Sequence, residues 1–112
     1  MIDTNIGAQV SEEMLANYFT YLVNHFYKIL PMRENEEETL GVYMQSLQVE
    51  LLGAKSLMTE FGKDPEFLVL TAILQWLIKH PNCSVKTVKR EVFKAINVCE
   101  KMRDRYKKAV QE

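Results

Sequence analysis

The sequence has few of the residues that interrupt regular structure. Its 112 residues include only four glycines and three prolines, whereas 47% are hydrophobic and 26% are charged. A fold of many short strands needs more turn residues than this, because Gly and Pro supply much of the backbone geometry of tight turns. The composition therefore predicts an all-α protein, and a chain of this length fits one domain with its own core.

Cysteine and histidine are also scarce, with two residues of each. Cys83 and Cys99 lie sixteen positions apart, and a helix across them would separate them by about 24 Å. A disulfide needs Cα atoms within about 7 Å of each other. A structural zinc site has four ligands, whereas His80 and Cys83 offer only two at a usable spacing. We therefore expect free thiols, no metal and no cofactor.

The sequence also lacks the short motifs of common enzymes. It contains no phosphate-binding glycine loop and no HExxH, GxSxG or CxxC motif. Neither His25 nor His80 follows a Glu at the spacing of di-iron helix bundles. Glu36, Glu37 and Glu38 are consecutive, so on a helix they point in different directions and fit a solvated first turn. These absences predict that the protein is not an enzyme.

No hydrophobic run is long enough for a membrane helix. The longest, residues 67–78, has twelve residues, against the roughly 20 that span a bilayer. The first residues have neither the basic segment nor the apolar segment of a secretion signal. We expect a cytoplasmic protein without a membrane partner.

The run belongs to a predicted helix over residues 65–80 that is apolar on nearly every side. Asp64 suits the N-cap and Pro65 the first turn. Apolar residues cover about 240° of its circumference, whereas an ordinary surface helix has a stripe of about 100°. We expect either deep burial inside the monomer or a symmetric dimer that covers one edge, near Val69 and Trp76.

The remaining chain has helical periodicity with clear start signals. Ser11 and Ser84 are suitable N-caps, and short connections between helices imply antiparallel neighbours. We predict a single up-and-down four-helix bundle over residues 11–112, after a flexible N-terminal arm over residues 1–10. The expected helices are 11–30, 36–61, 65–80 and 85–108.

The second expected helix has two apolar surfaces. Its main seam repeats at alternating spacings of three and four residues, as in coiled coils. Gly41 and Gly53 weaken this helix by up to about 1 kcal/mol each relative to Ala, and we attribute them to close helix approach. A second, smaller patch is formed by Val42, Val49 and Leu52 on the far side.

Charge is distributed unevenly along the chain. From Ser84 to Glu112 there are nine basic and four acidic residues, a balance of +5, whereas the preceding residues have a balance of −6. One face of the last expected helix presents a basic stripe about 33 Å long. The stripe fits a solvated face, a contact with an acidic protein surface, or a contact with nucleic-acid phosphates. Its residues are Lys86, Arg90, Lys94, Lys101, Arg105 and Lys108.

Two hypotheses about function follow. The first is a non-enzymatic small helical interaction module that forms a homodimer or binds a helical protein partner, with Val69, Trp76 and Phe93 as candidate contacts. Phe93 lies off the apolar seam among basic residues, which suits an anchor ringed by polar groups. The alternative is a nucleic-acid-binding regulator that uses the basic stripe. Residues 73–92 resemble a helix-turn-helix motif over about twenty positions, without Gly in the turn.

Overall fold

The computed structural model describes residues 1–111 and is almost entirely helical. Four long helices pack against one another, and a short helix and a small hairpin complete the fold. The predicted all-α bundle is therefore confirmed. In chain order the elements are β1 (Ile2–Asp3), β2 (Gln9–Val10), α1 (Glu12–Glu34), α2 (Leu40–Leu57), α3 (Thr59–Lys63), α4 (Pro65–Lys79) and α5 (Val85–Gln111).

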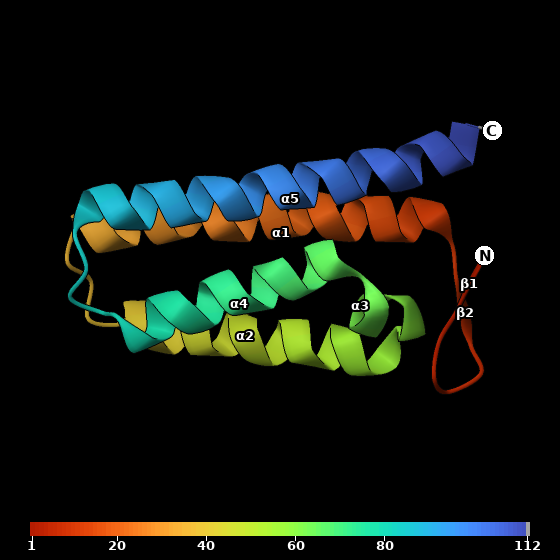
Figure 1. Ribbon diagram of the computed structural model, residues 1–112, viewed down its shortest axis with the longest axis horizontal. Coiled ribbons are helices and arrows are strands. Elements are labelled where there is room, and N and C mark those ends of the chain that lie inside the picture. Colours follow the sequence, from red (N-terminus) through yellow and green to blue (C-terminus); the bar gives the residue numbers. More distant parts are fainter. Residues whose placement is uncertain (112) are drawn as a thin grey trace.

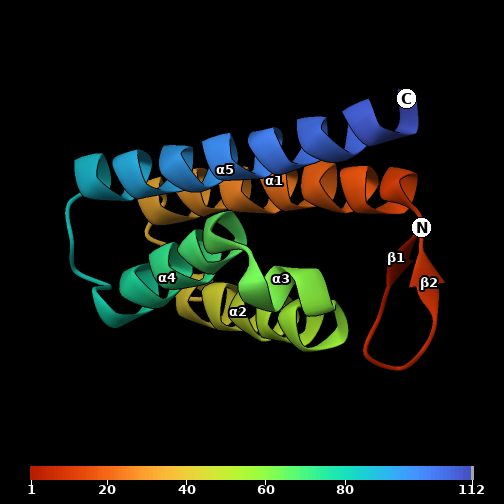
Figure 2. The ribbon, with the colours of Figure 1, turned by 45° about the vertical axis from the view of Figure 1, so that its right-hand side comes forward.

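The long helices alternate in direction and form two layers. Helices α1 and α5 lie side by side along most of their length, and α2 and α4 lie beneath them as a second layer (Figure 1). The turned view in Figure 2 shows the same two pairs, with α3 closing the end of the α2/α4 layer. Short connections between consecutive helices favour this antiparallel arrangement.

An aromatic cluster joins the layers at the end where α3 lies. The ring of Phe61 stacks on that of Phe67 with centroids 4.4 Å apart, and Phe19 meets both rings edge-on. Tyr106 stacks on Phe19 from α5, with centroids 5.9 Å apart. Because these rings come from α1, α3, α4 and α5, one cluster fixes four elements together.

Helix α1 runs past the proline at which the sequence predicted its end. Pro31 lies in the last turn, where its missing N–H removes only one helical hydrogen bond, and Asn35 N still donates to the Pro31 carbonyl oxygen (2.9 Å). The helix therefore ends at Glu34 rather than residue 30. Asn35 is its C-cap and not the start of the next helix, which begins only at Leu40.

The predicted helix over residues 36–61 is in fact two helices. The chain takes an extended conformation at Met58, between α2 and α3. Asn5 explains this end of α2, because its backbone N–H donates to the Leu57 carbonyl oxygen (2.7 Å) and its side chain donates to the Ser56 carbonyl oxygen. These two carbonyl groups lie in the last turn of α2, where the carbonyl oxygens have no N–H donor inside the helix.

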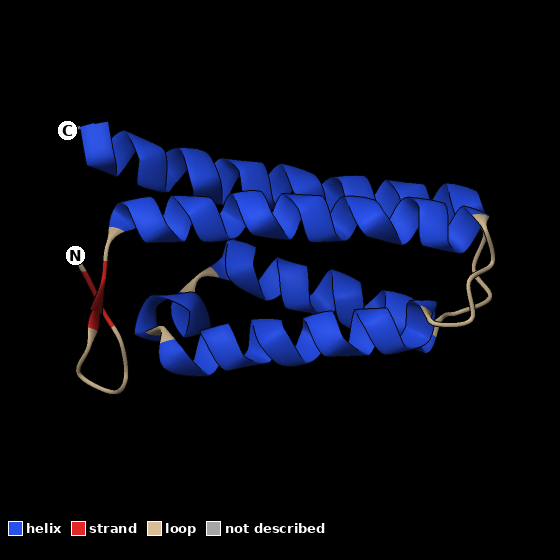
Figure 3. Ribbon diagram, turned by 180° about the vertical axis from the view of Figure 1, so that it is seen from behind, coloured by secondary structure: helices blue, strands red, loops and turns tan. Residues whose placement is uncertain are grey.

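Residues 1–10 were predicted to be a flexible arm, and the structure corrects this. They form the hairpin of β1 and β2, beside the start of α1 in Figure 3. Thr4 is buried and forms a bridge with Met58, and the Met1 amino group pairs with Glu12 (2.9 Å). The arm therefore packs against α2 and α1.

Three predicted helix starts are confirmed by side-chain caps. Ser11 Oγ accepts from Met14 N, and Asp64 Oδ1 accepts from Glu66 N (2.9 Å). Ser84 Oγ accepts from the N–H of the third residue after it (3.1 Å). These contacts satisfy N–H groups that have no partner inside the helix.

Candidate interaction surface

The two layers of the bundle differ strongly in charge. The 18 residues of α2 include only two charged side chains, Glu50 and Lys55, and the 15 residues of α4 also include two, Glu66 and Lys79. Helix α5 alone has twelve charged residues among 27. The α2/α4 layer is therefore nearly neutral on a protein that is otherwise well charged.

Two of these four charged side chains contact the α1/α5 layer. Glu50 accepts a hydrogen bond from Tyr21 Oη of α1 (3.1 Å), and Glu66 pairs with Arg105 of α5 (3.2 Å). Lys55 is partly buried. Only Lys79, at the end of α4, is a charged residue of these two helices in the exposed class.

The exposed side of the layer is the main candidate surface, and we call it the neutral face. It combines large apolar side chains with glycines, serines and amides, which leaves it partly apolar and free of charge. Its members on α2 are Gly41, Val42, Gln45, Ser46, Val49, Leu52, Gly53 and Ser56, and on α4 they are Val69, Ala72, Gln75 and Trp76.

A buried amide links the two helices behind this face. Gln48 Nε2 donates to the Thr71 carbonyl oxygen (3.3 Å) and to Gln75 Oε1 (3.2 Å), so α2 and α4 are held in one register. The Gln48 Oε1 atom is buried and has no partner within the described residues. A buried polar link of this kind favours one arrangement of the helices over others.

Val69 and Trp76 share the neutral face, as the sequence predicted for the edge of α4. The two side chains are 43% and 37% exposed, so deep burial inside the monomer is wrong. The Trp76 ring stacks on the ring of His80 with centroids 4.2 Å apart, and His80 Nδ1 lies 2.8 Å from the Trp76 carbonyl oxygen. This contact fixes the indole against the end of α4.

Phe93 lies elsewhere, on α5 in the other layer. Its ring meets Tyr27 of α1 edge-on, with centroids 6.1 Å apart. The structure therefore separates Phe93 from Val69 and Trp76. Sequence periodicity gave the exposed side of each helix but not which exposed sides lie together.

The contribution of α2 to the neutral face was only half recognised. Val42, Val49 and Leu52 appeared as a small separate patch, and nothing joined them to α4. The available signal was the lack of charge along the exposed positions of both helices.

The two glycines of α2 also need a new explanation, because a Cβ built on Gly41 or Gly53 meets no atom within 4 Å. Close approach within the monomer is therefore the wrong reason for them.

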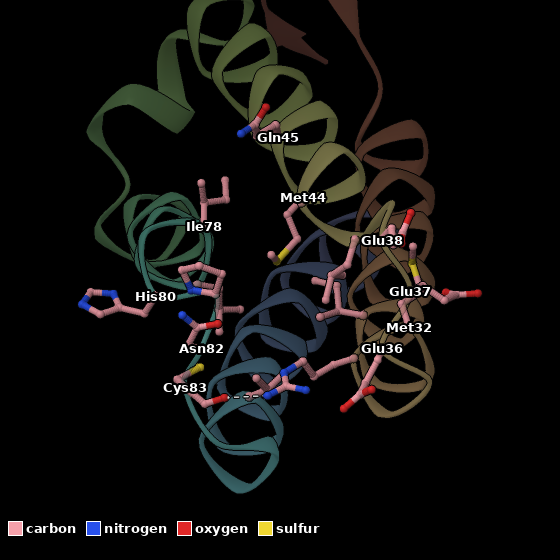
Figure 4. Close-up of a pocket in the computed structure, with 17 residues that line it drawn as sticks. Met32, Glu36, Glu37, Glu38, Met44, Gln45, Ile78, His80, Asn82 and Cys83 are labelled. Carbon is pink, nitrogen blue, oxygen red and sulfur yellow. Dashed lines mark hydrogen bonds between the residues drawn. The ribbon is translucent and has the colours of Figure 1, made fainter.

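A cavity lies among the C-terminal ends of α1 and α4, the start of α2 and the loops at that end of the bundle. Its volume is about 490 Å³, within the range of small-molecule sites. Figure 4 shows Met44 and Ile78 on its two sides and Cys83 and Glu36 nearer the loops. Arg33 Nη2 donates to the Cys83 carbonyl oxygen (2.9 Å). The lining includes one guanidinium, Arg33, and three exposed carboxylates, Glu36, Glu37 and Glu38, so these four residues have a formal charge of −2.

The basic stripe is largely neutralised by the protein itself. Arg105 forms ion pairs with Asp64 (2.7 Å) and Glu66, and its hydrogen bond to Asp64 raises its pKa. The Lys101 ammonium lies 3.8 Å from Glu66. Arg90 and Lys94 both contact Glu91. Among residues 1–111, only Lys86 and Lys108 of the stripe have no carboxylate within 4 Å.

The reactive side chains are mostly shielded. Both cysteines are free, and burial raises the pKa of the Cys99 thiol to about 12. Burial lowers the pKa of His25, whose Nδ1 lies 2.6 Å from Tyr43 Oη. Within the described chain, no three His, Cys, Asp or Glu side chains gather where they could hold a metal ion.

Comparison of the chain with protein-family models, curated proteins and solved structures gives no match. Of the helices in residues 1–111, none is long and apolar enough to cross a membrane.

Proposed function

We propose that this chain is a non-enzymatic helical interaction module that forms a homodimer through the neutral face. The observation that carries the proposal is the composition of the exposed side of α2 and α4. Large apolar side chains are exposed there, namely Val42, Val49, Leu52 and Trp76, and Lys79 is the only exposed charged residue of these two helices. The centre of a protein interface is depleted in charge and enriched in aromatic and apolar groups. The neutral face has this composition.

The size of the face is sufficient for a modest dimer. The 18 residues of α2 extend about 27 Å, and two packed helices are roughly 20 Å wide. The footprint is thus on the order of 500 Å² per copy, or about 1,000 Å² for both. This is near the lower limit of specific interfaces, which predicts a dissociation constant in the micromolar range rather than an obligate dimer.

A second copy fits this face better than a charged partner does. In a two-fold dimer the same surface meets itself, so each charge near the axis would face a like charge. The neutral face carries no such charge near its centre, and a two-fold axis near Val49 places Lys79 of the two copies at opposite ends. Gly53 and Ser46, which are small and exposed, allow the two α2 helices to approach closely.

The single tryptophan provides a direct test, because Trp76 lies on the proposed interface. Acrylamide quenching should weaken and emission should shift to shorter wavelength as protein concentration rises from about micromolar to about millimolar, since the partner covers the indole. The Val49→Glu variant serves as the control and should be quenched equally at every concentration. Equal quenching of the wild-type protein across this range would refute the proposal.

The ion pairs of the basic stripe disfavour the alternative of a nucleic-acid-binding regulator. Each phosphate contact needs a cation that is free to leave its present partner, and four of the six stripe residues contact carboxylates of the same chain. Four to six phosphate contacts would give a log–log salt dependence with a slope of roughly −4 to −5 on duplex DNA. We expect no mobility shift with mixed-sequence DNA even at low salt.

A further inference from the structure

An aromatic pair lies exposed on the other layer of the bundle. Tyr27 of α1 is 45% exposed and Phe93 of α5 is 42% exposed, although their rings contact each other edge-on. The pair therefore links the two longest helices on their solvent side. Two aromatic rings fixed against each other present apolar area at little cost in side-chain entropy.

Basic side chains gather around this pair. Lys28 follows Tyr27 on α1, and α5 supplies four more basic residues within seven positions of Phe93. Glu34 and Glu91 are the acidic residues that pair with members of this group, and they leave a local balance of +3. Within residues 1–111, Lys28 and Lys86 have no carboxylate within 4 Å. The basic members are Lys28, Lys86, Lys89, Arg90 and Lys94.

We propose that Tyr27, Phe93 and these five basic residues form a second docking surface, the aromatic–basic patch, for a short acidic segment of another protein. An apolar side chain of that segment would pack on the two rings, and its carboxylates would meet Lys28 and Lys86, the cations of the patch that have no carboxylate within 4 Å among residues 1–111. Interface hot spots have this form, with an aromatic anchor inside a polar rim. The positive rim selects an acidic partner and increases its rate of association.

A peptide fits the patch better than a nucleic acid. Farther along α5, Lys101 and Arg105 are held by Asp64 and Glu66, so the cations near Phe93 are separated from Lys108 at the end of the helix and do not form one continuous free stripe. A phosphate backbone gains from several cations in a row, whereas a short peptide needs only a few beside one apolar contact.

The patch lies on the α1/α5 layer and the neutral face on the α2/α4 layer. A homodimer through the neutral face would leave both patches accessible, and the pair could bind two acidic segments at once. Linked sites bind a multivalent target more tightly than one site does. This inference goes beyond the proposed function and does not depend on it.

The test is selection of short random peptides on the immobilised wild-type protein, followed by affinity measurements on one enriched peptide. We expect enrichment of Asp and Glu together with Leu, Ile, Phe or Trp. Phe93→Ala should weaken binding by roughly tenfold or more, because the anchor is lost. Lys86→Glu should weaken it similarly and reduce its salt dependence. Val110→Ala, an exposed apolar position at the far end of α5, should leave binding unchanged.

Three results would overturn the inference. Enrichment without acidic residues would contradict the role of the cations, and equal binding by wild-type and Phe93→Ala proteins, both with the same circular dichroism, would contradict the anchor. Tighter binding of a single-stranded oligonucleotide of equal charge, lost in Phe93→Ala, would assign the patch to nucleic acid. The Val49→Glu variant should bind the peptide as the wild type does. The solution mass of Val49→Glu therefore reports on the neutral face, and its affinity for the peptide reports on the aromatic–basic patch.

Discussion

Replacing Val49 by Glu should break the proposed homodimer without harming the monomer. Val49 is 70% exposed and lies near the middle of α2, with no basic residue of the neutral face beside it. In the monomer the new carboxylate stays in water, and Glu has a higher helix propensity than Val. The free energy of unfolding of the monomer should therefore stay the same or rise by a few tenths of a kcal/mol.

In the dimer the same substitution acts twice. Each copy loses the burial of a valine, roughly 1–2 kcal/mol, and places a carboxylate where no opposite charge is available. A combined cost of only about 2 kcal/mol per copy gives about 4 kcal/mol for the dimer, which corresponds to a dissociation constant about a thousandfold higher. Two carboxylates near the two-fold axis also repel each other, so this is a lower bound.

Sedimentation equilibrium measures this change directly. Val110→Glu is the matched control, because it adds the same charge at a valine that is 52% exposed on α5. The control should dimerise as the wild type does. Equal dissociation constants for wild-type and Val49→Glu proteins would refute the assignment of the neutral face. Equal weakening by both substitutions would show that net charge, and not this face, controls association.

Three further changes have defined outcomes. Gly53→Ala should raise the free energy of unfolding of the monomer by up to about 1 kcal/mol in urea, because the added Cβ meets no atom within 4 Å. The same substitution should weaken dimerisation, because the methyl group hinders the close approach of the two α2 helices. A stronger dimer would contradict this. Phe67→Ala should cost about 3–5 kcal/mol, because it removes a fully buried ring stacked on Phe61, whereas the exposed Val69→Ala should cost far less. Burial raises the pKa of Cys99 and of Tyr106 to about 12, above the pKa values of these groups in the unfolded chain. The free energy of unfolding should therefore keep its full value below about pH 9 and fall as the pH rises toward 12. Urea unfolding at several alkaline pH values should show a smaller fall for Cys99→Ala, and an identical fall would contradict the role of the thiol.

The elements that could be predicted are those whose signals are local. Ser11 and Asp64 cap their helices through side chains only two or three residues from their partners, so spacing alone revealed them. The end of α2 could not be predicted in this way, because it depends on Asn5, which lies 51 residues from Ser56 in sequence. The N-terminal hairpin was missed for the same reason, since its contact with Met58 is long-range.

The candidate surface was predictable one helix at a time. Val69 and Trp76 were correctly placed on one edge of α4, because both follow from helical periodicity. Joining them to Val49 required the knowledge that α2 lies beside α4, and separating them from Phe93 required the position of α5 in the other layer. Neither is contained in the periodicity of a single segment.

The mass of the wild-type protein in solution tests the central claim most directly. The chain has a mass of 13.1 kDa, so light scattering across a dilution series should show a mass that rises toward twice this value as concentration increases. The midpoint should fall in the micromolar range, as expected for an interface of about 1,000 Å². A mass of 13.1 kDa at every concentration up to about millimolar would contradict self-association through the neutral face.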